Sequence, residues 1–106
     1  MTDLPDRILI GPFTYEVERP TDIRNDGDRK LWGQIEYAKS KIRVLADVAP
    51  DRARETLFHE CLHGISEAGA FGLSEKQVGQ LSAAITDFLL RNPKVIALFQ
   101  AESEAS

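Results

Sequence analysis

The stretch ARETLFHECLHGISEA, residues 53–68, decides how the rest of the chain is interpreted. It contains both histidines of the chain, His59 and His63, with Glu60 directly after the first. Apolar side chains recur through it at helical spacing, so it predicts an α-helix. On such a helix the two imidazoles lie about 40° apart around the axis and about 6 Å apart along it.

Two imidazoles at this spacing can bind one metal ion, because their nitrogens converge on one point beside the helix. Zinc binds neutral imidazole at roughly 2.0–2.1 Å and can keep an open position for water. Glu60 projects about 100° from His59, so it reaches such a water more easily than the ion. A carboxylate there can take a proton as water attacks a carbonyl and deliver it to the leaving amine. The H-E-x-x-H pattern therefore predicts zinc bound by His59 and His63, with Glu60 as general base.

A chance surface pair of histidines and a purely structural pair are the alternatives. The context favours the metal site, because the motif lies in a helical segment, after a strand-rich half and before a second amphipathic helix. The helix has a predicted apolar side, formed by Leu57, Cys61, Gly64, Ile65 and Ala68. We interpret Cys61 as a small buried hydrophobe rather than a ligand. The opposite side carries Arg52, Thr56, His59, His63 and Glu67, which we expect a sheet edge to cover.

Residues 7–48 have the pattern of β-strands. RILI (7–10) and FTYEVE (13–18) flank the turn signal Gly11-Pro12, and KLWGQIEY (30–37) precedes KIRVLA (41–46). The intervening PTDIRNDGDR has the composition of a loop. Gly33 inside a strand indicates a bulge or a close backbone approach. We expect a small, mainly antiparallel sheet of three or four strands.

Residues 50–101 have the pattern of helices, with a frayed tail at 102–106. Pro50 and Asp51 suit a first helical turn, and GAFG (69–72) ends that helix. Ser74 and Gln77 predict a capping box for a second, antiparallel helix. Its predicted apolar face consists of Val78, Leu81, Ile85, Phe88 and Leu89. Asn92-Pro93 ends it, and a short last helix bears Val95, Ile96, Leu98 and Phe99.

Length and composition bound the remaining possibilities. With 106 residues, the chain predicts one α+β domain spanning residues 1–106, and a single cysteine gives no internal disulfide. The net charge of −4 argues against a sequence-independent nucleic-acid partner. The N-terminal sequence is not typical of a signal peptide, and no apolar run approaches the roughly 20 residues of a membrane span. We expect a cytoplasmic protein with no nucleic-acid or membrane partner.

The segments ETLFHECLHGI and GLSEKQVGQLSAAITDFLLRNP resemble a known group. They look like the small zincin-type metallopeptidase-like proteins of phages and prophages, which are related to the ImmA/IrrE metallopeptidases. The resemblance covers roughly residues 30–93 and is centred on the H-E-x-x-H motif. It implies a minimal zincin: a small sheet, the motif helix and a second helix that supplies a third ligand.

The resemblance makes His59 and His63 zinc ligands and Glu60 the general base, and it offers Glu75 as the third ligand. Glu67 competes for that role, because it lies on the same helical face as the histidines. However, His59 and Glu67 are about 12 Å apart along the axis, whereas Glu75 can approach from a second element. We choose Glu75, although it could also be only a favourable first-turn residue. Tyr37 is a candidate for stabilising the oxyanion.

The predicted function is zinc-dependent hydrolysis of a peptide or a flexible protein segment, bound as an extended strand along the sheet edge. A non-catalytic zinc-binding structural or interaction module is the first alternative. A metal-free interaction protein, with an exposed sheet edge and an apolar C-terminal helix, is the second.

Overall fold

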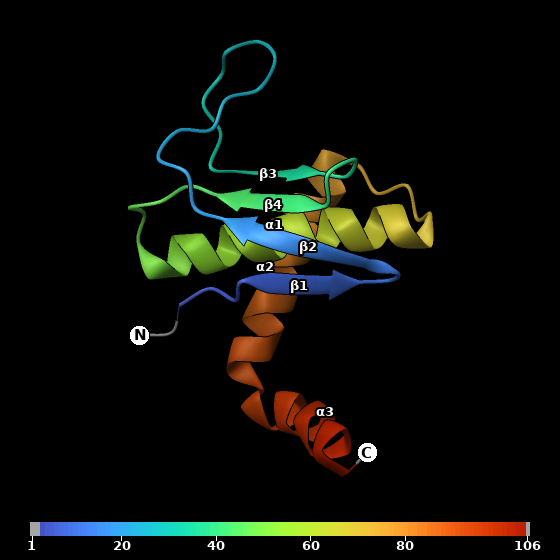
Figure 1. The fold of residues 1–106 in the computed structure, drawn as a ribbon. Coiled ribbons are helices and arrows are strands. Elements are labelled where there is room, and N and C mark those ends of the chain that lie inside the picture. The colour runs from blue at the N-terminus through green and yellow to red at the C-terminus, as the bar shows by residue number, and fades with distance from the viewer. Residues whose placement is uncertain (1–2, 106) are drawn as a thin grey trace.

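The strands predicted in the first half of the chain form one four-stranded sheet, and three helices follow it (Figure 1). The computed structural model describes residues 3–105, with side chains described up to residue 101. The strands are β1 (Arg7–Ile10), β2 (Phe13–Glu18), β3 (Gly33–Glu36) and β4 (Lys41–Val44). The helices are α1 (Pro50–Gly69), α2 (Glu75–Arg91) and α3 (Pro93–Ala105). The α+β class is therefore confirmed.

The sheet is mixed, which corrects the expectation of a mainly antiparallel one. The strand order is β1-β2-β4-β3, and the central pair β2–β4 is parallel. The long connection 19–32 places β3 at the edge of the sheet and leaves one strand position between β2 and β3. The β3–β4 hairpin then brings β4 into that position, beside β2. Charged pairs join the strands here: Glu18 accepts from Lys41 and from Arg43, each at 3.1 Å. These cross-strand contacts favour the parallel register.

Helix α1 packs on one face of the sheet, as Figure 1 shows. The sheet contributes Ile42 and Val44, both fully buried, and Tyr15, which is 1% exposed. Ala53 and Leu57 of α1 complete this core. The apolar face predicted for α1 was only partly correct, because Ile65 is 42% exposed whereas Glu60 is buried.

Two glycines let α1 approach the sheet closely. A side chain at Gly33 of β3 would meet the Thr56 methyl group, and its Cβ would lie 3.2 Å from the Glu60 carboxylate. A Cβ on Gly64 of α1 would lie 2.8 Å from Ile10. Gly33 therefore marks a close approach, the second of the two structural readings of this glycine. This contact brings the polar side of α1 against the edge strand β3.

The turn between α1 and α2 is fixed by local hydrogen bonds. Ala70 ends α1 in the left-handed conformation, with φ of 56°. The Ser66 hydroxyl accepts from the Leu73 amide at 2.9 Å. Ser74 and Gln77 form the predicted capping box, which is confirmed. These bonds fix the start of α2, and therefore the position of Glu75, relative to α1.

Helix α2 crosses α1 at a steep angle rather than running back along it, and its C-terminal half extends past β1 (Figure 1). The predicted apolar face of α2 is accordingly corrected: Val78 and Ser82 are buried, whereas Leu81 and Phe88 are exposed. Helix α3 contacts α2 and continues away from the sheet. None of the helices in the described part of the chain combines the length and apolarity needed to cross a bilayer.

We predict that Gly33→Ala destabilises the fold by about 1–3 kcal/mol, because the new methyl group overpacks the α1–β3 contact. Equilibrium urea unfolding measures the change. Gly27→Ala is the matched control, since its Cβ would meet only ordinary contacts and should change stability by less than about 0.5 kcal/mol. Thr56→Ser should partly restore the Gly33→Ala protein by removing the clashing methyl group. Equal stability of the two glycine variants would contradict the close approach.

Candidate metal centre

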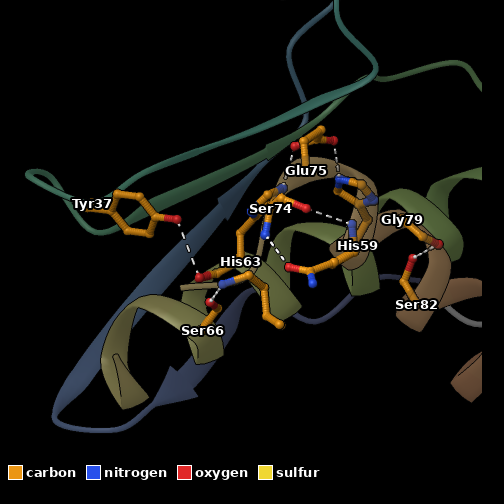
Figure 2. Close-up of polar contacts among 10 residues, drawn as sticks. Tyr37, His59, His63, Ser66, Ser74, Glu75, Gly79 and Ser82 are labelled. Atoms are coloured by element: carbon orange, nitrogen blue, oxygen red, sulfur yellow. Dashed lines mark hydrogen bonds and ion pairs between the residues drawn. The ribbon is translucent and has the colours of Figure 1, made fainter. Parts of the chain in front are cut away.

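The side chains of His59, His63 and Glu75 meet at the crossing of α1 and α2 (Figure 2). His59 Nε2 lies 2.8 Å from Glu75 Oε1, and His63 Nε2 lies 2.7 Å from Glu75 Oε2. The two rings are 4.9 Å apart, centroid to centroid, at an interplanar angle of 65°. The carboxylate of α2 thus joins two successive turns of α1.

This group has the chemistry of a metal site. It is the one group of three or more potential ligands within the described residues, and its donor atoms lie within 4.8 Å of one another. Ligand atoms of a tetrahedral zinc ion at 2.0–2.1 Å would be about 3.3 Å apart. The distances from the two histidines to Glu75 are shorter than this by about half an ångström. An exposed glutamate can make a shift of this size by rotating its side chain. The three residues could therefore hold a metal ion.

Electrostatics hold the Glu75 carboxylate in its charged form. Partial burial raises the pKa of Glu75, but the neighbouring His59 and His63 lower it by more, so that it lies below its ordinary value. A charged carboxylate and two imidazoles form a ligand set that suits a divalent transition metal. Gly79 of α2 lies beside the ring of His59, where a Cβ would be 3.9 Å from Cε1.

Glu60 lies next to this group but on the side of α1 that faces β3. It is 9% exposed, packed against Gly33. Burial raises the pKa of Glu60 to about 7, with His59 opposing the shift and Glu75 adding to it. A bound cation would lower this pKa again by favouring the charged form. Glu60 can therefore exchange a proton near neutral pH when no cation is bound, and a cation would favour its charged form, the form that accepts a proton.

A cleft of about 630 Å³ runs beside the centre. His59, Glu60 and Glu75 line part of it, and the edge strand β3 contributes Gly33. The rest of its wall is formed by the segment before β3 and by the first turns of α1, through Asn25, Arg29, Lys30, Leu31, Trp32, Arg52, Glu55 and Thr56. The cleft gives a bound molecule access to His59, Glu75 and Glu60.

Other residues singled out in the sequence lie outside this centre. Glu67 is exposed and is not part of the ligand group. The hydroxyl of Tyr37 donates to the backbone carbonyl of His63 at 3.3 Å, as Figure 2 shows, and Tyr37 does not line the large cleft. Cys61 is partly buried against the core. This burial, with a smaller contribution from the negative charge of Glu60, raises the pKa of its thiol to about 11. A protonated thiol is a poor metal ligand.

Several cleft residues were missed from the sequence. The segment containing Arg29 and Lys30 has the sequence of a solvated loop, and no local pattern indicates that it lines the same cleft as α1. Asn25 organises this loop, because its side-chain oxygen accepts from the amides of Gly27 and Arg29 at 2.9 and 3.0 Å. The sequence offered one signal for these cleft residues: Arg52 lies two helical turns before His59, on the same side of α1.

Comparison of the chain with protein-family models, with curated protein sequences and with solved structures found no match in any of the three. The function is therefore inferred from the chemistry of the site.

We predict that Glu75→Ala weakens divalent-metal affinity at least 10–100-fold, the loss typical of removing even an outer-shell partner. Competition against a chromophoric chelator measures the affinity. Glu67→Ala is the matched control and should have a smaller effect, because Glu67 lies outside the group. A larger loss for Glu67→Ala than for Glu75→Ala would reverse the assignment.

Proposed function

We propose that the protein is a zinc-dependent peptide hydrolase. The observation that carries the proposal is the convergence of His59, His63 and Glu75 beside a buried carboxyl, Glu60, with His59, Glu60 and Glu75 lining an open cleft. Zinc suits two imidazoles and one carboxylate, and three protein ligands are typical of catalytic rather than structural zinc sites. The arrangement supports the zincin-like interpretation of the motif.

Each residue has a distinct role in this mechanism. His59, His63 and Glu75 hold the ion, which when bound supplies a Lewis acid at this point of the cleft. Glu60 accepts a proton from the attacking water and transfers it to the amine that leaves. The packing of Glu60 against Gly33 limits its motion, so the proton is exchanged at one defined position.

The substrate in this proposal is an extended peptide segment. β3 is an edge strand of the sheet and continues the wall of the cleft through Gly33. An edge strand has unpaired backbone groups that can bind an extended chain. A folded protein would therefore have to present a flexible segment to be cleaved.

A non-catalytic metal site is the second candidate function. The contacts of Glu75 with both histidines link α2 to α1, so a metal ion here would also tie the two helices together. In this alternative Glu60 has no chemical role. The two candidates differ in what the removal of the Glu60 carboxylate should do.

We predict that Glu60→Gln retains zinc and fold but lowers peptide hydrolysis by about 10²–10⁴-fold, because the amide keeps the shape and loses the base. A peptide-library assay on both proteins measures the hydrolysis, with zinc content and unfolding temperature checked for each. Glu67→Gln is a matched control, since it makes the same change on α1 at an exposed residue that lies outside both the cleft and the ligand group. Equal hydrolysis by wild type and Glu60→Gln would exclude Glu60 as the base.

We also predict about one zinc per chain by elemental analysis of untagged protein, and loss of stoichiometric zinc in His59→Ala and in His63→Ala. Saturating zinc should raise the unfolding temperature of the wild type, since it binds the folded state. Full zinc retention in the double histidine variant would contradict the proposed ligands.

A further inference from the structure

The part of the cleft wall that lies outside the candidate metal centre is basic, although the chain as a whole carries a net charge of −4. Arg29 and Lys30 line it from the segment before β3, and Arg52 lines it from the first turn of α1. Glu55 is the one acidic residue in this part of the wall, which we call the rim, so the rim has an excess of positive charge. The other two carboxylates that line the cleft are not part of the rim, because Glu75 belongs to the candidate ligand group and Glu60 lies beside it.

These cations are available to a ligand. Within residues 3–101, ion pairs hold Lys41 and Arg43 to Glu18, but none involves Arg29, Lys30 or Arg52. The Arg52 guanidinium instead lies over the ring of Trp32, with its carbon 5.6 Å from the ring centroid. Trp32 itself is 54% exposed on the cleft wall. This arrangement orients Arg52 at the rim without neutralising it.

The distance from Arg52 to His59 along α1 indicates which residue of a bound peptide would reach the rim. Arg52 precedes His59 by seven residues on the same face of α1, which is about 10 Å along the helix axis. An extended peptide covers this length in about three residues. A side chain at that separation from the cleaved bond would therefore reach the basic rim.

We propose that the cleft selects acidic peptide segments, with an aspartate or glutamate about three residues from the cleaved bond held by Arg52, Lys30 and Arg29. This inference rests on the proposed function for the position of the bond. Carboxylates complement the guanidinium and ammonium groups of the rim. A peptide fits better than a nucleic acid, because three cations in one short cleft are too few to follow a phosphate backbone.

The experiment measures peptide binding separately from cleavage. Trp32 is the only tryptophan of the chain and lines the cleft, so its fluorescence reports occupancy. Two capped peptides that differ only in carrying an Asp-Asp or a Lys-Lys pair are titrated into zinc-treated Glu60→Gln protein and into chelator-treated wild type. Arg52→Gln and Lys30→Gln are the test variants. Arg54→Gln is the matched control, because Arg54 lines a separate apolar groove on another face of α1.

The acidic peptide should bind at least about fivefold more tightly than the basic one, and each test substitution should lower its affinity by about fivefold. The preference should weaken at high ionic strength, and Arg54→Gln should retain it. Equal binding of the two peptides, or no effect of Arg52→Gln and Lys30→Gln, would overturn the inference. Tighter binding of a single-stranded oligonucleotide than of the acidic peptide would also overturn it.

Cleavage assays with zinc-loaded wild type separate this inference from the proposed function. Cleavage without preference for acidic peptides would reject the inference and leave the hydrolase function standing. Acid-selective binding without cleavage of any acidic peptide would reject the hydrolase function and leave a binding cleft for acidic segments.

Discussion

The close contact between α1 and β3 is the constraint on which the rest of the structure depends. Gly33 has no side chain, so Thr56 and Glu60 of α1 can pack directly against the edge strand. Gly64 allows the same approach at the side chain of Ile10. The contact buries Glu60, raises its pKa, and turns the histidines of α1 toward the crossing with α2. A larger residue at either glycine would push the helix outward and separate Glu60 from the edge strand.

The second helix completes the centre because its first residue is fixed in place. Hydrogen bonds from the turn and the capping box hold the start of α2, and Glu75 is the first residue of that helix. Its exposed carboxylate reaches both imidazoles. The ligand group is thus assembled from two rigid helices, and the cleft wall comes from a third element, the segment that leads into β3.

Periodicity and local turn chemistry predict most of this fold. The bounds of α1, the capping box at Ser74 and the position of each strand follow from patterns within a few residues. The parallel pairing of β2 with β4 does not follow from such patterns, because it depends on the path of the long connection 19–32. The exposure of Ile65 is not predicted either, because it depends on how α1 packs with the rest of the fold rather than on its own sequence pattern.

In the candidate site, too, local spacing predicts some features, whereas others depend on the tertiary fold. The spacing of His59 and His63 is a local property of one helix, so the sequence predicts it directly. That Glu75 meets both imidazoles depends on the crossing of two helices, which sequence spacing only suggests. The basic rim was missed, because residues distant in the chain form it: the loop before β3 and the start of α1 meet only in the folded protein.

Anomalous diffraction at the zinc absorption edge, from crystals of untagged protein grown with zinc, tests the central claim most directly. The account predicts a strong peak in contact with Nε2 of His59, Nε2 of His63 and the carboxylate of Glu75, beside Glu60. Zinc bound elsewhere, with these three side chains still paired to one another, would contradict the account.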